Sequence, residues 1–64
     1  MIPRLVYRPE DNAAYIRLSE AEVLESEEVA PQVVFDYDAE GHIVGIELLD
    51  AKAQLPRDAR SEAA

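Results

Sequence analysis

Apolar and polar residues alternate along much of this chain, and the alternation predicts β-strands. In residues 4–8 (RLVYR), Leu5 and Tyr7 share one face of an extended strand, and the remaining three residues take the other face. Residues 13–18 (AAYIRL) repeat the period of two, and residues 9–12 (PEDN) between them are typical turn formers. We therefore expect a first β-hairpin with a four-residue loop.

Residues 32–37 (QVVFDY) and 42–49 (HIVGIELL) give the clearest strand signal, because both are rich in β-branched and aromatic residues. Apolar residues occur on both faces of each segment, which favours a central position in a sheet that is covered on each side. The intervening Asp38-Ala39-Glu40-Gly41 has the pattern of a type I turn followed by a left-handed glycine. These segments predict a second hairpin.

The acidic segment between the two hairpins, residues 19–28 (SEAEVLESEE), is open to two interpretations. Ser19 followed by Glu22 is a capping-box signature for a helix. A helix here would have few apolar residues to bury, and an edge strand over residues 22–29 is the favoured alternative, since glutamates discourage unwanted sheet pairing. Pro31 ends either element.

Asp50 can cap a short helix over residues 51–55 (AKAQL), which Pro56 ends. Residues 56–64 are polar and rich in alanine, so we expect a flexible tail. The predicted fold is a single β-rich domain over residues 1–55. It is a mainly β (small α+β) protein, with an antiparallel sheet of two β-hairpins, a possible acidic edge strand and a short C-terminal helix.

The small size of the chain changes this picture. At 64 residues with no cysteine, it can bury only a modest core and cannot add disulfides. A homodimer would cover sheet surface that a monomer must expose, and we expect one. The sequence has no 18-residue apolar run and no apolar leader segment at its N-terminus, so we expect a cytoplasmic protein with no membrane partner.

The formal net charge of −8 argues against nucleic-acid binding, which relies on Lys and Arg. Five glutamates crowd one stretch of nine residues: Glu20, Glu22, Glu25, Glu27 and Glu28. A surface of this kind either keeps a small protein soluble or faces a basic protein partner, where complementary charge speeds encounter.

Residues 36–47 also match the spacing of a calcium-binding EF-hand loop, with Asp36, Asp38, Glu40 and Glu47 at ligand positions and Gly41 at the central glycine. An EF-hand loop is entered from a helix, whereas residues 31–35 (PQVVF) are unsuited to one. The turn explains the same residues without an ion, and loss of Gly41 is expected to harm folding rather than ion binding.

Other candidate chemistry is sparse. His42 is the only histidine and lacks the partners of a zinc site or a catalytic triad. Asp36 and Asp38 have the spacing of paired carboxylates on one strand face, yet nothing around them predicts a substrate pocket. Tyr7, Tyr15 and Tyr37 are better explained by cross-strand packing than by base stacking. We therefore predict no catalytic, cofactor or metal residues, and no enzyme activity.

Several segments together resemble the family called domain of unknown function 2283. The resemblance rests on residues 14–18 (AYIRL), 34–38 (VFDYD), Gly41, 43–47 (IVGIE) and 49–51 (LDA), and extends over residues 6–55. It implies a compact, mostly β single domain of a small bacterial protein, with no assigned functional residues. The occurrence of some family genes beside genes for small ribonuclease-like toxins implies an antitoxin-like role.

The sequence thus predicts a non-enzymatic protein-interaction module that binds a basic partner. The alternative is a sensor of calcium or a small ligand that uses Asp36, Asp38, Glu40 and Glu47.

Overall fold

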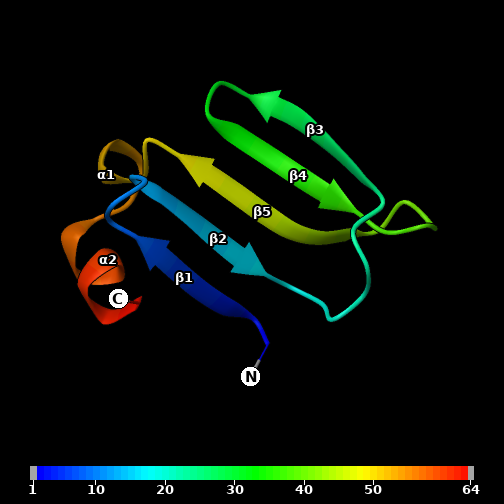
Figure 1. Cartoon of the computed structure of the whole chain (residues 1–64), viewed down its shortest axis with the longest axis horizontal. Helices are drawn as coiled ribbons and strands as arrows, with labels where there is room; N and C mark the ends of the chain where they lie inside the picture. The colour runs from blue at the N-terminus through cyan, green and yellow to red at the C-terminus, as the bar shows by residue number, and fades with distance from the viewer. Residues whose placement is uncertain (1, 64) are drawn as a thin grey trace.

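The computed structural model describes residues 2–63, and the side chains of residues 2–60. Five strands form one antiparallel sheet, followed by two short helices (Figure 1). The elements are β1 (Arg4–Arg8), β2 (Ala13–Arg17), β3 (Glu25–Ala30), β4 (Val33–Tyr37), β5 (Ile43–Leu49), α1 (Ala51–Gln54) and α2 (Arg57–Ala63). The predicted mainly β, small α+β class is confirmed.

The strand order in the sheet is β1-β2-β5-β4-β3. The two predicted hairpins, β1–β2 and β4–β5, both form, and β3 and β4 make a further antiparallel pair. Strand β5 pairs with β2 on one side and with β4 on the other. The predicted central position of β4 and β5 is therefore confirmed, and β5 is the middle strand.

The acidic segment contains a strand and not a helix. Strand β3 covers Glu25–Ala30, and all six of its residues are exposed. The Ser19 hydroxyl accepts a hydrogen bond from the backbone N–H of Ala21 at 3.0 Å, so it closes a local turn where a helix cap was the alternative. The favoured strand is confirmed, although it begins three residues later than expected.

The turn between β4 and β5 has the predicted geometry. The Gly41 N–H donates to the Asp38 carbonyl at 3.1 Å, and Gly41 has a φ of 82°. This left-handed conformation favours glycine because it lacks a Cβ. The carboxylate of Asp38 adds to the turn by accepting from the backbone N–H groups of Glu40 and His42, both at 2.9 Å.

Helix α1 is one residue shorter than expected, and Asp50 does not cap it through its side chain. Asp50 instead has a left-handed φ of 51°, and its Oδ1 accepts a hydrogen bond from the Asn12 amide at 2.9 Å. The Asn12 Oδ1 accepts from the Lys52 N–H, and the Asn12 carbonyl accepts from the Ala51 N–H, both at 2.9 Å. The β1–β2 turn therefore takes over the capping of α1.

The structure adds a second helix that the sequence pattern did not predict. Helix α2 occupies Arg57–Ala63, within the segment expected to be a tail, and lies against β1. Among residues 2–63, no helix is long and apolar enough to cross a membrane.

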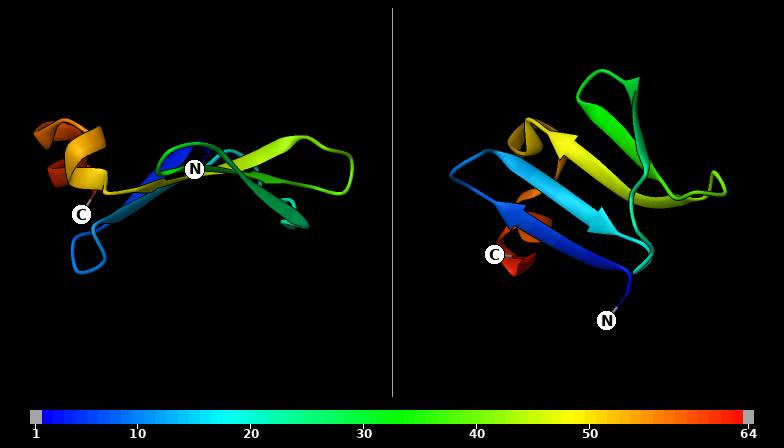
Figure 2. Two further views of the ribbon diagram at one scale, coloured as in Figure 1. Left: turned by 90° about the horizontal axis from the view of Figure 1, so that it is seen from above. Right: turned by 45° about the vertical axis from the view of Figure 1, so that its right-hand side comes forward.

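The sheet forms a single layer. Both helices gather at the end of the sheet beside the β1–β2 turn, where α1 contacts β2 and α2 contacts β1 (Figures 1 and 2). Few residues are buried as a result. Among the described residues, Ala14, Val44 and Ala51 are the buried apolar ones, and Val44 is the only large side chain that is fully buried.

The register separates an apolar face from a polar face, because residues paired across strands point to the same side. One row of the apolar face runs across the sheet through Leu5, Ile16, Ile46 and Phe35. The neighbouring row runs through Tyr7, Ala14, Leu48 and Val33. We call these eight residues the apolar face.

Candidate functional site

The polar face concentrates charged and hydroxyl groups at its centre. One row across it contains Arg17 on β2, Gly45 on β5, Asp36 on β4 and Ser26 on β3. In the next row, Tyr15 on β2 lies beside Glu47 on β5. We call Tyr15, Ser26, Asp36 and Glu47 the carboxyl cluster. Its members come from four strands, so only the folded sheet brings them together.

Gly45 makes room for this cluster. Tyr15 lies across β5 at this glycine, and a Cβ atom on residue 45 would collide with the phenol oxygen and Cζ of Tyr15. The absence of a side chain therefore lets the phenol reach Asp36 on the strand beyond. A glycine within a strand commonly marks such a close approach. The guanidinium of Arg17 lies over the Tyr15 ring, 5.9 Å from its centroid, and stabilises the ring's position.

Asp36 is the buried centre of the carboxyl cluster, with only 3% of its surface exposed. The Ser26 hydroxyl donates to its Oδ1 at 2.6 Å. Burial raises the pKa of Tyr15, and the charge and hydrogen bonding of Asp36 raise that pKa further. The Tyr15 phenol therefore remains a hydrogen-bond donor at neutral pH, which satisfies part of the buried carboxylate.

Glu47 completes the cluster as a second acid. Its pKa is raised from the usual 4.5, first by desolvation and then by hydrogen bonding and charge repulsion from Asp36. Burial beside Asp36 therefore favours the protonated form of Glu47. The sequence analysis considered Asp36 with Asp38 as the paired carboxylates, and the structure instead pairs Asp36 with Glu47.

A groove of about 240 Å³ opens beside the cluster on the polar face. Its lining residues include Val6, Arg8, Ala13, Tyr15, Glu47 and Leu49. An acid, a phenol and a guanidinium thus border one shallow space with an apolar margin. This arrangement can hold or exchange a proton and accept hydrogen bonds, and among the described side chains it presents no serine, threonine or cysteine to attack a substrate.

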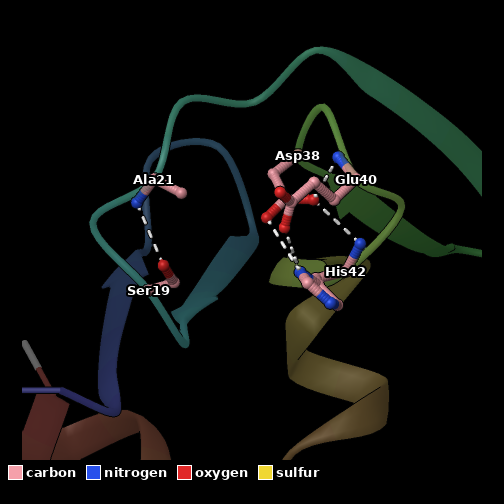
Figure 3. A network of polar contacts seen from close by, with 5 residues as sticks. All are labelled: Ser19, Ala21, Asp38, Glu40 and His42. Atoms are coloured by element: carbon pink, nitrogen blue, oxygen red, sulfur yellow. Dashed lines mark hydrogen bonds and ion pairs between the residues drawn. The ribbon is translucent and has the colours of Figure 1, made fainter.

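The β4–β5 turn carries a separate group of polar side chains, drawn in Figure 3. The His42 Nδ1 lies 3.3 Å from an Asp38 oxygen and 3.6 Å from a Glu40 oxygen. Hydrogen bonds from the His42 and Glu40 backbone and the His42 ring lower the pKa of Asp38, against a smaller opposing effect of desolvation. Within residues 2–60, these three are the one group of His and acidic side chains close enough to share a metal ion.

The calcium-loop spacing is not assembled in three dimensions. The loop is entered from β4 and left into β5, so both flanking elements are strands. Asp36 and Glu47 belong to the carboxyl cluster, whereas Asp38 and Glu40 lie at the turn. Asp38 is already occupied by the turn amides. The four carboxylates of the candidate calcium loop therefore do not converge on one point.

The acidic margin of the sheet is the third candidate region. We define it as β3 together with residues 20–24, and its five glutamates are all exposed. A groove of about 250 Å³ separates residues 21–24 from the β4–β5 turn. It is lined by Ala21, Glu22, Leu24, Asp38, Ala39 and Glu40. Leu24 contributes an apolar surface there and is 55% exposed. The groove therefore combines an apolar floor with several carboxylates.

The raised pKa of Glu47 predicts a stabilising substitution. Stability linked to a raised acid pKa is present below the usual pKa of 4.5 and is lost as pH rises through the higher folded value. Glu47→Gln should therefore increase the free energy of unfolding at pH 7 by about 1 kcal/mol, because the amide can donate to Asp36 without charge. Urea unfolding at acid and neutral pH measures this.

The matched control for that substitution is Glu10→Gln, which changes an exposed acid in the β1–β2 turn. We expect no comparable gain from it. The difference in stability between Glu47→Gln and the unsubstituted protein should shrink as pH falls below 4.5. A Glu47→Gln protein that is less stable at pH 7 would contradict the interpretation that burial beside Asp36 disfavours the charged form of Glu47.

Comparison with known protein families matches residues 4–52 to the family described as "Protein of unknown function (DUF2283)". Searches of curated proteins and of solved structures gave no match.

Proposed function

The chain thus belongs to the DUF2283 family, proteins of unknown function, and from its geometry we propose that it is a non-enzymatic interaction module that binds a basic protein partner. The acidic margin is the proposed binding surface. The observation that carries this proposal is the concentration of five exposed glutamates on the edge strand β3 and on the connection that leads into it, beside a groove with an exposed leucine.

The two edges of the sheet differ in a way that favours β3 as the interaction edge. Strand β1 has α2 packed against it and carries Arg4 and Arg8. Strand β3 is exposed throughout and carries Glu25, Glu27 and Glu28. An exposed edge strand can add a strand from another chain through backbone hydrogen bonds. Its glutamates oppose pairing with another copy of β3 and favour a strand that carries Lys or Arg.

The groove beside Leu24 adds an apolar contact to the charged surface. Electrostatic complementarity mainly sets encounter rate and selectivity, whereas affinity depends more on buried apolar groups. The exposed side chain of Leu24 and the methyl groups of Ala21 and Ala39 offer such a contact. A basic segment with one apolar side chain therefore fits both the floor of this groove and its carboxylate border.

An antitoxin-like role is consistent with this chemistry. An enzyme that cleaves RNA must contact phosphates with Lys and Arg, so its active surface is basic. An acidic surface can occupy such a site by presenting carboxylates where the phosphates would bind. We propose that neutralisation of a basic toxin of this kind is the biological use of the acidic margin.

The proposal is tested with a synthetic peptide that alternates Lys and Val, followed by fluorescence anisotropy. We expect binding that weakens markedly between about 0.05 and 0.2 M salt, where screening becomes effective. A peptide that alternates Glu and Val should not bind. Glu22→Gln with Glu25→Gln should weaken binding of the basic peptide roughly fivefold, because one carboxylate at the groove and one at the start of β3 are lost.

The matched control removes the same charge elsewhere, with Glu10→Gln and Asp11→Asn in the exposed β1–β2 turn. This variant should bind the basic peptide almost as well as the unsubstituted protein. The proposal fails if the turn variant and the acidic-margin variant lose affinity equally. The peptide would then respond only to the net charge of the protein, and the acidic margin would not be the binding surface.

A further inference from the structure

The groove beside the carboxyl cluster has the form of a small-molecule site. It is about 240 Å³ in volume and lies over β1, β2 and β5, whereas the acidic margin follows β3 at the opposite edge of the sheet. Val6, Ala13 and Leu49 give it an apolar floor, and Leu49 is 40% exposed. A concave, mostly apolar space with a few polar groups is the usual form of a ligand site.

The sheet gives up stability around this groove. A glycine inside a strand, at position 45, is unfavourable in itself, and it is required here because Tyr15 crosses the strand. Asp36 is buried on the neighbouring strand, and burial raises the pKa of both Tyr15 and Glu47, which line the groove. Titratable groups shifted in this way gather at functional sites. Binding of a basic partner at β3 uses none of these groove-lining groups.

Opposite charges line the two sides of the groove. Glu47 approaches it from β5 and Arg8 from β1. Strand β2 lies between them, so the two backbones are about 10 Å apart. Arg8 forms no ion pair with any carboxylate within residues 2–60, and its guanidinium is therefore available to a carboxylate from outside. Glu47, with Asp36 beside it, favours a positive group at the other side.

We propose that this groove binds a small ω-amino carboxylate, a linear molecule with an ammonium group at one end and a carboxylate at the other. The carboxylate pairs with Arg8, the ammonium pairs with Glu47, and the methylene chain lies on the apolar floor. Both charges are needed because the groove presents both. Several methylenes are needed because the two strands that supply the charges are not adjacent. The groove is smaller than the roughly 300 Å³ of the smallest drug-sized sites, which suits a ligand of this size.

Titration of the full, isotope-labelled chain with ε-aminocaproate tests the proposal by two-dimensional amide NMR. We expect saturable shifts at the backbone amides of residues 6–15 and 47–49, around the groove. Caproate lacks the ammonium and hexylamine lacks the carboxylate. Each of these two should bind at least tenfold more weakly, because one charge-assisted contact is lost.

Matched variants separate the groove from the remainder of the polar face. Arg8→Gln and Glu47→Gln should each weaken ε-aminocaproate roughly tenfold. Arg4 lies on the same face of β1 outside the groove, and Glu28 shares the cross-strand row of Glu47 on β3. Arg4→Gln and Glu28→Gln should therefore leave the affinity nearly unchanged. Glu47→Gln is expected to fold at least as stably as the unsubstituted protein, so its loss of affinity reports the ligand contact.

The pH dependence of binding gives a readout that a purely structural role of Glu47 would not produce. Tyr15 on β2 and Asp36 on β4 are the titratable neighbours of Glu47. Because an ammonium pairs with the ionised carboxylate, affinity should increase as pH rises through the raised pKa of Glu47, and Glu47→Gln should abolish this increase. The proposal is overturned if about 10 mM ε-aminocaproate shifts no amide around the groove, if caproate or hexylamine binds as tightly, or if Arg4→Gln weakens binding as much as Arg8→Gln.

Discussion

Gly45→Ala is expected to lower the free energy of unfolding by about 2 kcal/mol, although alanine is the better residue for an ordinary strand. A Cβ at this position would overlap the phenol oxygen and Cζ of Tyr15. The ring would have to swing away from β5 and would lose its interaction with Asp36. The buried carboxylate would then lack one of its donors, which is the main source of the loss.

The test of Gly45→Ala is a double-mutant cycle with Tyr15→Leu, read by urea unfolding. If the tyrosine ring causes the penalty, Gly45→Ala should cost less than about 0.5 kcal/mol in the Tyr15→Leu background. An equal cost in both backgrounds would mean that the glycine serves a backbone role instead.

Asn12→Ala is expected to lower the free energy of unfolding by about 3 kcal/mol, the largest loss for any single substitution in the turns. Asn12 has a φ of 50°, a left-handed conformation that costs alanine about 1 kcal/mol. Its side chain also donates to Asp50 and accepts from the Lys52 N–H. Each of these hydrogen bonds contributes about 1 kcal/mol. Thermal or urea unfolding measures the total.

Asn12→Gly separates the two contributions, because glycine accepts the left-handed conformation but lacks the amide. We expect it to recover about 1 kcal/mol of the loss seen with alanine. Amide exchange at Lys52 should rise in both variants, since its N–H donates to the side-chain Oδ1 of Asn12. Unchanged exchange in Asn12→Ala would show that α1 is held by other contacts.

Local sequence patterns predicted the strands and the turn at Gly41 because their determinants are local. The alternation within residues 32–37 and 42–49 and the single glycine after Asp38 specify extended segments and a tight reversal. Helix α2 was missed because its sequence, RDARSEA, has no apolar stripe to signal a helix. The helix lies against β1, and this contact exists only because β1 is an edge strand of the folded sheet, which no local sequence pattern specifies.

The carboxyl cluster was predicted only in part because register decides its membership. Asp36 was noted, but Tyr15, Ser26 and Glu47 become its neighbours only when β5 inserts between β2 and β4. No local pattern specifies which strands pair across such a distance in sequence. One available signal was Gly45, since a glycine inside an otherwise β-branched strand indicates that another group approaches its backbone.

The strand order also bears on how the chain acquires its structure during synthesis. Among the five strands of this sheet, β5 is the last to be synthesised, and it joins the β1–β2 pair to the β3–β4 pair. Until it emerges, the β1–β2 and β3–β4 hairpins have no shared neighbour, and an isolated hairpin is marginally stable in water. Assembly of the sheet therefore awaits the synthesis of β5, and the sheet should form in one cooperative step rather than strand by strand.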